Sequence, residues 1–292
     1  MEGLTQVGDC TYRLEVPEAS TFVPAVSYFI TDGDGALIDP GPGAAVPALR
    51  RAMESLGLRR LDCIIPTHVH VDHAGGAGAV AALCPSARVL VHPRGVRHLA
   101  HPAHLIEITQ QIYGTDFETR SGTVLPVSGP QLRGVEDGEV VRLGGRELQF
   151  IHAPGHASHH LAILDRSQQG LFCGEALGLP PHLLPSVAPY SFHEEDYLAT
   201  IESLRRLDPR VLFFAHGGAD AHPRPAFTTA AENTRIYSRM TLDGLRKGES
   251  PAEIALRFVV DVKRRFGLTY APDGAQLLVT GYEMYFRKKG LA

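Results

Sequence analysis

The chain has 292 residues, of which 44% are hydrophobic, and this is enough apolar material for the core of one large domain or two smaller ones. Its formal net charge is −4 with both signs present, whereas binding to a nucleic-acid backbone calls for clustered basic residues. The sequence shows neither a signal-peptide pattern nor an apolar run long enough to span a membrane. We therefore expect a cytoplasmic protein without nucleic-acid or membrane partners.

The four cysteines are scattered without any Cys-x-x-Cys pair. This spacing argues against a zinc finger, a thioredoxin motif or a disulfide framework. Cys63 and Cys173 lie in apolar, strand-like runs, so we expect them to be reduced residues of the core.

The first part of the chain alternates between predicted strands and helices. In order, the expected elements are a strand over 21–30, a strand over 36–39, a helix over 45–56, a strand over 61–66, a helix over 74–83 and a strand over 87–92. The Asp-Gly pairs at 32–35 favour a hairpin between the first two strands, because glycine takes the positive φ of such turns. Gly57 is the expected C-cap of the first helix. The alternation is typical of a layered α/β domain.

Directly after the strand expected at 61–66, three histidines and an aspartate fall within six residues: His68, His70, Asp72 and His73. Imidazole nitrogen and carboxylate oxygen are ligands that suit zinc, iron and manganese. A chance run of surface residues would have no such spacing and no adjoining buried strand. The pattern therefore predicts a metal-binding loop between a strand and a helix.

The segment 93–130 contains three more histidines, His98, His101 and His104, at a spacing of three. They could share one helix face, although Pro102 interrupts the helix near its start. We interpret this segment as a cover with solvent-facing histidines rather than as a second metal site. If it covers the metal loop, it would shape the access of substrate.

The second half repeats the arrangement of a strand that ends in a potential ligand. The expected elements are strands over 140–143, 147–152, 161–164 and 170–173, a helix over 193–207 and a strand over 210–214. His156 follows a Pro-Gly turn, Glu175 follows Gly174, and His216 follows the last strand. From Pro225 the pattern is helical, over 227–245, 251–266 and 277–288, with Leu278, Tyr282 and Tyr285 on one face. We expect a catalytic domain over 1–224 and a helical extension over 225–292.

Taken together, these motifs resemble the metallo-β-lactamase-fold superfamily. The first motif matches the superfamily's His-x-His-x-Asp-His, Leu37 to Gly41 looks like its early strand and turn, and His156 with His160 resembles its second histidine loop. The helical tail is similar to that of the glyoxalase-II-like branch. The resemblance implies an α/β fold, a four-layer αββα sandwich with appended C-terminal helices.

The resemblance also implies a site for two divalent metal ions, with zinc as the first choice and iron or manganese as alternatives. His68, His70 and His156 would hold one ion, and Asp72, His73 and His216 the other. Glu175 stands where the family usually carries an aspartate, and its extra methylene moves the carboxylate outward by about 1.5 Å. Glu175 would bridge the two ions with altered geometry, bind one ion only, or point away from them. We favour the arrangements in which it is a ligand. Asp39 and His160 look like residues that orient the ligands.

The function that we expect is hydrolysis of an ester, thioester or lactone bond of a small molecule. Two divalent ions would present a hydroxide to the scissile carbonyl and polarise it, with Asp72 as proton acceptor. The alternative is an iron-dependent redox enzyme of the same fold, persulfide-dioxygenase-like or diiron. A nuclease, a secreted β-lactamase and a non-catalytic metal-stabilised scaffold fit the sequence less well. Association of two copies into a homodimer is compatible with the sequence.

Overall fold

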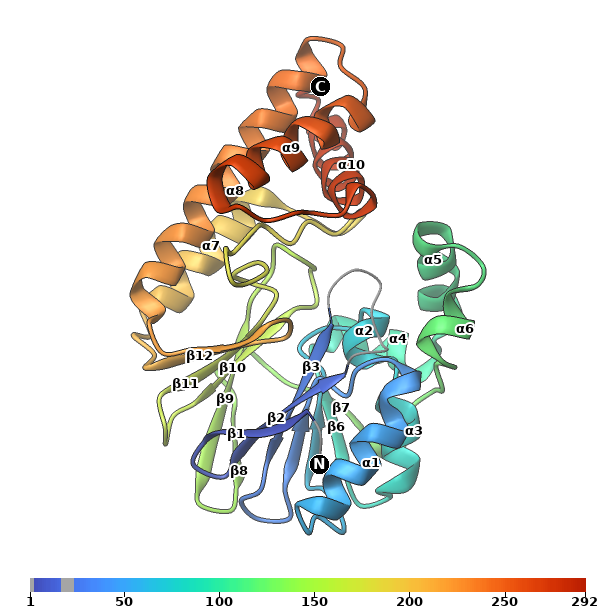
Figure 1. The fold of residues 1–292 in the computed structure, drawn as a ribbon. Coiled ribbons are helices and arrows are strands. Elements are labelled where there is room, and N and C mark those ends of the chain that lie inside the picture. Colours follow the sequence, from blue (N-terminus) through green and yellow to red (C-terminus); the bar gives the residue numbers. More distant parts are fainter. Residues whose placement is uncertain (1–2, 17–23) are drawn as a thin grey trace. The chain divides into compact units, whose positions relative to one another are not determined.

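A computed structural model describes residues 3–16 and 24–292 of the chain, which divide into two compact units (Figure 1). The first unit comprises residues 1–152, 159–174 and 209–221, and the second comprises 153–158, 175–208 and 222–292. The strand expected from residue 21 begins at Ala25, and Phe22 and Val23 lie outside the described residues. The expected domain boundary after residue 224 stays a prediction.

The first unit contains a seven-stranded sheet in the order of the sequence, β1 to β7. Its strands are β1 (Leu4–Gly8), β2 (Thr11–Val16), β3 (Ala25–Ile30), β4 (Ala36–Ile38), β5 (Cys63–Ile65), β6 (Arg88–Val91) and β7 (Leu132–Gly134). The strands β3 and β4 form the expected hairpin, and β4, β5 and β6 run parallel. Because β4 and β5 are parallel, the residues that follow them, Asp39 and the metal loop, emerge at the same edge of the sheet.

A six-stranded sheet with the order β13-β12-β11-β10-β9-β8 forms the rest of the unit's β-structure. Its strands are β8 (Val140–Leu143), β9 (Arg146–His152), β10 (Leu161–Asp165), β11 (Gly170–Gly174), β12 (Val211–Phe214) and β13 (Gly218–Asp220). The predicted strands of the second half are confirmed to within two residues at either end. The short β13, which pairs with β12, was missed.

Alternation along the strands of the first sheet divides the core of this unit into two layers. Phe29, Leu37 and Ile64 pack with apolar residues of the helices over 46–55 and 77–83. Their neighbours Tyr28, Ile38 and Ile65 face residues of the second sheet. Both faces of these central strands are therefore buried, which explains why they read as continuous apolar runs.

The helices of this unit are α1 (Val46–Ser55), α2 (Val71–Ala74), α3 (Ala77–Leu83), α4 (Val96–Ala100), α5 (Ala103–Tyr113) and α6 (Phe117–Ser121), with 3-10 turns at Gly43–Ala45, Pro93–Gly95 and Gly129–Gln131. The expected helix over 74–83 is thus divided at Gly75 and Gly76. A Cβ at Gly78 would overlap the backbone of Leu125, so this glycine allows α3 to approach its neighbour.

The histidine-rich segment is also divided. α4 ends at Ala100 and α5 begins at Ala103, so His98, His101 and His104 do not lie along one helix. Pro102 precedes the first residue of α5, near the helix start where proline is favoured, and it ends the shared face that regular spacing suggested.

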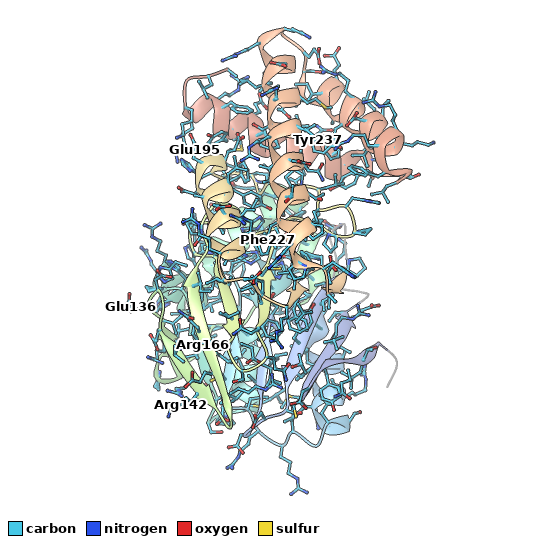
Figure 2. All side chains as sticks on the ribbon, turned by 90° about the vertical axis from the view of Figure 1, so that its left-hand side faces the viewer. Glu136, Arg142, Arg166, Glu195, Phe227 and Tyr237 are labelled. Atoms are coloured by element: carbon cyan, nitrogen blue, oxygen red, sulfur yellow. The ribbon has the colours of Figure 1, made fainter. Side chains whose placement is uncertain are left out.

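The second unit is built from α7 (Glu194–Arg205), α8 (Pro223–Arg246), α9 (Pro251–Phe266) and α10 (Pro272–Lys288), with Glu195 on α7 and Phe227 and Tyr237 on α8 (Figure 2). The helix α9 begins with a capping box between Ser250 and Glu253 and is followed by Gly267 in the left-handed conformation. The expected apolar face of α10 is confirmed, because Leu278, Tyr282 and Tyr285 are all buried. Among the described residues, no helix combines the length and apolarity that a membrane span requires.

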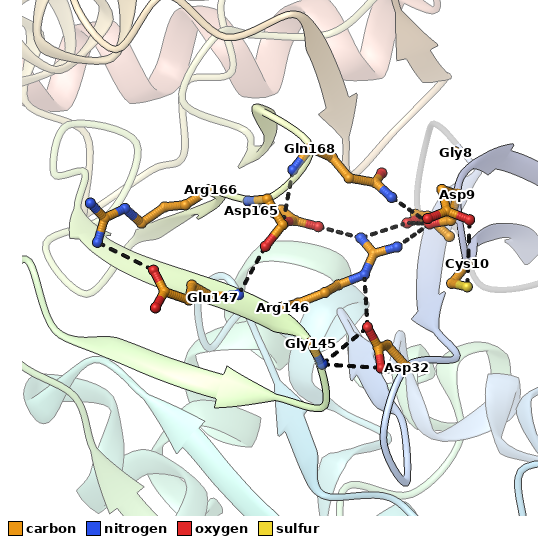
Figure 3. Close-up of polar contacts among 12 residues, drawn as sticks. Gly8, Asp9, Cys10, Asp32, Gly145, Arg146, Glu147, Asp165, Arg166 and Gln168 are labelled. Carbon is orange, nitrogen blue, oxygen red and sulfur yellow. Dashed lines mark hydrogen bonds and ion pairs between the residues drawn. The ribbon is translucent and has the colours of Figure 1, made fainter.

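A buried arginine holds the turns of the two sheets together. The Arg146 guanidinium, at the start of β9, donates hydrogen bonds to the Asp165 carboxylate and the Asp9 carbonyl, and its Nε lies 3.8 Å from Asp32 (Figure 3). The side chains of Arg146 and Asp165 are 4% and 2% exposed. Asp32 also accepts the N–H of Gly145. One cation therefore joins the β1–β2 and β3–β4 turns of the first sheet to the second sheet.

We predict that Arg146→Ala lowers the free energy of unfolding by about 3–5 kcal/mol, because it leaves the Asp165 carboxylate buried without its cation. The matched control is Arg142→Ala, which removes an exposed arginine of β8 that pairs with Glu147 (Figure 2) and should cost about 0.5 kcal/mol or less. Urea unfolding monitored by circular dichroism measures both. Equal losses in the two variants would contradict this role of Arg146.

A second polar pair joins the two sheets through neighbouring imidazoles. The rings of His92, after β6, and His152, the last residue of β9, lie 4.1 Å apart. The backbone N–H of Arg94 donates to His92 Nδ1, and His152 Nε2 donates to the Val135 carbonyl. Burial, followed by the nearness of His152 and Arg94, lowers the pKa of His92 from 6.5 to about 4.

Because the pKa of His92 is lower in the folded chain than in the unfolded chain, the unfolded state binds the extra proton. The contribution of His92 to stability is therefore present above pH 6.5 and is lost as the pH falls toward 4. We expect His92→Gln to reduce the slope of the free energy of unfolding against pH. The reduction corresponds to at most one bound proton, about 1.4 kcal/mol per pH unit. Urea unfolding of metal-free wild type and variant at pH 4.5–7.5 tests this; parallel curves would contradict it.

Candidate metal centre

A buried aspartate, Asp39, anchors the metal loop, residues 67–73, through hydrogen bonds. Asp39 follows β4 and has a positive φ of 49°. Its carboxylate accepts the Thr67 N–H at 2.7 Å and the Thr67 hydroxyl at 3.1 Å. The same carboxylate accepts the Nδ1–H of His73 at 3.3 Å. Asp39 therefore fixes both the first residue of the loop and one of its imidazoles, as expected for a residue that orients ligands.

Asp72, His73 and His216 converge on one point of the first unit. Each offers an atom within 4.8 Å of the others, and this trio is one of the groups of potential metal ligands among the described residues. His73 Nε2 and His216 Nε2 lie 3.3 and 3.7 Å from Asp72 Oδ2. Asp72 and His73 come from α2, whereas His216 follows β12. An isolated bridge between His216 and Ala25, at the start of β3, brings these distant segments together.

The hydrogen bonds of the two imidazoles leave the metal-binding nitrogen facing the site. His216 Nδ1 lies 3.1 Å from the Pro24 carbonyl, and His73 Nδ1 lies 3.3 Å from Asp39. A carbonyl or carboxylate oxygen only accepts, so Nδ1 must carry the proton in each ring. In the neutral form of either ring, the form that can bind a metal, the lone pair is on Nε2, toward Asp72. This is the second-sphere pattern typical of histidines that bind metal ions.

The electrostatics of His73 show that the trio is suited to a cation. Burial opposes the protonation of this fully buried ring, but the carboxylates of Asp72 and Asp39 outweigh burial and raise the pKa of His73 well above its ordinary value. Two carboxylates thus face one imidazole in a site from which water is largely excluded. A divalent ion would satisfy the same negative charge, so the residues present fit a metal.

His68 and His70 face each other at the edge of the same loop. Thr67 Oγ1 lies 3.1 Å from His68 Nδ1, and because this hydroxyl already donates to Asp39, the ring must donate to it. His68 Nε2 then lies 2.9 Å from His70 Nδ1. His160 stacks on His68 with ring centroids 5.0 Å apart, and its expected orienting role stays a prediction. A Cβ at Gly174 would overlap His160, and Gly174 has a positive φ, so glycine is needed there.

In the second unit, His156 and Glu175 form a similar pair, in which the imidazole Nε2 faces a carboxylate and Nδ1–H donates to an oxygen. His156 Nε2 lies 3.1 Å from Glu175 Oε2, and the His156 Nδ1–H donates to the Ser186 carbonyl. The Ser186 hydroxyl donates to Glu175 Oε1 at 2.6 Å, and Tyr197 donates to the Glu175 carbonyl. Glu175 thus points toward His156 instead of away from it. Ligation of a metal by His68, His70, His156 and Glu175 stays a prediction, as does binding by the trio.

Sequence reasoning missed the residues that hold the ligands in place. Thr67, the Pro24 carbonyl and Ser186 were not singled out, and no local pattern marks a backbone carbonyl as an acceptor for a distant imidazole. His159, between His156 and His160 in the sequence, was not singled out either, yet its ring lies 5.8 Å from that of His70. Cys63 and Cys173 are free, buried thiols, as expected; burial raises the pKa of Cys63 to about 11.

Comparison with known proteins connects this geometry to a family. A model of the metallo-beta-lactamase superfamily matches residues 20–216. The chain is 28% identical to a hydroxyacylglutathione hydrolase of Aeromonas hydrophila, over 69% of this chain and 65% of that protein. It is 31% identical to the acyl-coenzyme A thioesterase MBLAC2 of Homo sapiens, over 56% of this chain and 57% of that protein. It therefore spans less than two thirds of the length of these relatives.

A solved structure extends the likeness to nearly the whole chain. A metallo-beta-lactamase family protein of Thermus thermophilus superposes with a TM-score of 0.75 at 25% identity, covering 96% of this chain and 94% of that one. This confirms the expected α/β fold with two sheets flanked by helices and with additional C-terminal helices. The protein belongs to the metallo-beta-lactamase superfamily.

Proposed function

We propose that this protein is a metal-dependent hydrolase that cleaves the thioester bond of a small molecule. The observation that carries the proposal is the trio of Asp72, His73 and His216, in which both Nε2 atoms face one carboxylate. Two relatives are named for the hydrolysis of thioesters, which favours a thioester over an ester or a lactone. A thioester also releases a thiolate, whose conjugate acid has a pKa near 8.5, so its departure needs little help from a general acid.

Asp72, His73 and His216 would hold one divalent ion, and His68, His70, His156 and Glu175 would hold a second. Zinc is our first choice because tetrahedral sets of imidazole and carboxylate suit it, and iron or manganese are the alternatives. When bound, such ions would polarise the scissile carbonyl and lower the pKa of water toward neutrality.

The residues themselves would orient the reaction and move a proton. Asp72 has the most exposed side chain of the trio, at 22%, against 0% for His73 and 6% for His216. We therefore expect its carboxylate to accept the proton of the attacking water, while Asp39 keeps His73 in position. Ser186 holds Oε1 of Glu175 and so directs Oε2 toward His156.

We predict that zinc stabilises the metal-free protein, by about 2.7 kcal/mol at one hundred times its dissociation constant. Asp72→Asn should lose most of this gain because it replaces the carboxylate shared by His73 and His216. Asp116→Asn, the same change at an exposed carboxylate that pairs with surface Arg120, is the control and should keep the gain. Thermal unfolding with and without zinc, together with elemental analysis, measures both. An unchanged gain in Asp72→Asn would contradict the site.

We expect the purified protein to hydrolyse acyl thioesters, to lose activity on chelation and to regain it with metal. Asp72→Asn should lower kcat/KM by about 100-fold or more, because it removes an expected metal ligand as well as the expected proton acceptor. Glu175→Asp should retain more activity than Glu175→Gln, because it keeps the charge. A panel of thioesters, lactones, phosphoesters and persulfides tests this. A coloured, iron-containing protein that consumes oxygen with persulfides would instead support the redox alternative.

A further inference from the structure

A row of four imidazoles leads away from the metal loop across the first unit. The ring of His159 lies 5.8 Å from that of His70 and 6.0 Å from that of His98, and the ring of His98 lies 6.4 Å from that of His104. Of these four, His70 alone is an expected metal ligand. The other three rings belong to neither of the groups of described residues whose atoms lie close enough to bind an ion.

Three different segments supply this row. His159 precedes β10, and its Nδ1 accepts the Val69 N–H at 3.4 Å, which ties the ring to the metal loop. His98 lies on α4 and His104 on α5, the first two α-helices of the covering segment. His98 and His159 are partly exposed, and the side chain of His104 is 67% exposed. A ligand in solution can therefore reach the row while its other end approaches the metal loop.

The surroundings of His98 are basic. Burial has the largest effect on its pKa, which it lowers, and the charged groups that lower it further are His104 and Arg97. An acidic group, Glu107, lies at the outer end of the row, 3.4 Å from His104. His98 thus adjoins the charge of Arg97, and a bound anion would offset the repulsion that opposes protonation of His98.

We propose that His98, together with Arg97, His104 and His159, binds an anionic group of the substrate beside the metal loop. The inference rests on the proposed thioester hydrolysis. The anionic group would belong to the thiol part of the thioester substrate, at a distance from the scissile bond. Carboxylate and phosphate oxygens share the required chemistry, since both accept hydrogen bonds from imidazole and guanidinium. The covering segment would then select substrates by charge.

The first experiment measures binding to the metal-loaded protein without any reaction. The probes are S-methylglutathione for carboxylates, S-methyl-coenzyme A for phosphates and S-methyl-N-acetylcysteamine as a neutral thioether. We expect His98→Gln to weaken the binding of at least one anionic probe about 5- to 10-fold, less than a fully buried charged hydrogen bond would give. His101→Gln, an exposed histidine of the same segment outside the row, is the matched control and should bind as wild type does.

The same binding titrations, repeated at pH 8 and pH 6, measure how probe affinity depends on pH. A purely structural role for His98 would not affect this pH dependence. A bound anion favours protonated His98, so the wild-type protein should bind the anionic probe more tightly at pH 6. The other ionisable groups around His98 are Arg97, His104 and His159, with Glu107 beside His104 at the outer end of the row. In His98→Gln this gain should shrink. Identical pH dependence in both proteins, or no preference of wild type for either anionic probe over the neutral one, would overturn the proposal.

Turnover distinguishes this proposal from the proposed function. If thioesters are hydrolysed, His98→Gln should reduce the ratio of kcat/KM for anionic over neutral thioesters about 5- to 10-fold, mainly through KM. Equal losses for both substrates would overturn the anion site and leave the hydrolase proposal standing. Anion binding that depends on His98, in a protein that hydrolyses no thioester, would refute the proposed function alone.

Discussion

The candidate site depends on one buried carboxylate, that of Asp39. A charged group in the core is stable only if it is paired, and Asp39 meets this requirement with the N–H and hydroxyl of Thr67 and the Nδ1–H of His73. Its positive φ is costly for a residue with a side chain, and its backbone carbonyl is held by the Ser27 hydroxyl at 2.6 Å. This strained conformation positions the metal loop, because the carboxylate connects the end of β4 to both Thr67 and His73.

The same principle recurs in three of the expected ligand histidines. His73, His156 and His216 each direct Nδ1 to an oxygen, two of them to backbone carbonyls, and each directs Nε2 toward a carboxylate. Backbone carbonyls at strand ends and turns are rigid, so they set both the tautomer and the angle of the ring before a metal arrives. Within the first unit, this preorganisation holds His216 beside Asp72 and His73, which are distant from it in the sequence, with little freedom to rearrange. It also explains why Glu175, engaged by Ser186, is a defined ligand candidate despite its extra methylene.

Around this rigid centre, the covering segment offers a different kind of chemistry. Two of its histidines, His98 and His104, are partly or largely exposed and lie on successive helices, with Arg97 beside His98 and Glu107 beside His104. They are therefore suited to recognising a ligand instead of holding an ion. The buried Arg146 network, in contrast, joins the turns of the two sheets and contributes stability. The chain thus uses its charged and ionisable residues in three ways: to orient ligands, to bind a substrate's charge and to connect the sheets.

Much of the fold and of the candidate site could be predicted from the sequence, because local signals specify them. The His-x-His-x-Asp-His spacing marks the metal loop, and the strands β8 to β12 and the helix α9 follow from periodicity and capping residues. The hairpin of β1 and β2 was missed because its strands are short and only partly buried, with a weak alternating pattern.

What only the tertiary structure decided is which distant groups meet. The bridge between Ala25 and His216, the Pro24 carbonyl on His216, the Arg146 network and the row from His70 to His104 all join segments far apart in the sequence. Sequence alone determined the kinds of ligand and their strand-end positions, since these depend on residue type and local periodicity. Their tautomers, their partners and the imidazole row depend on long-range packing, which local patterns do not encode.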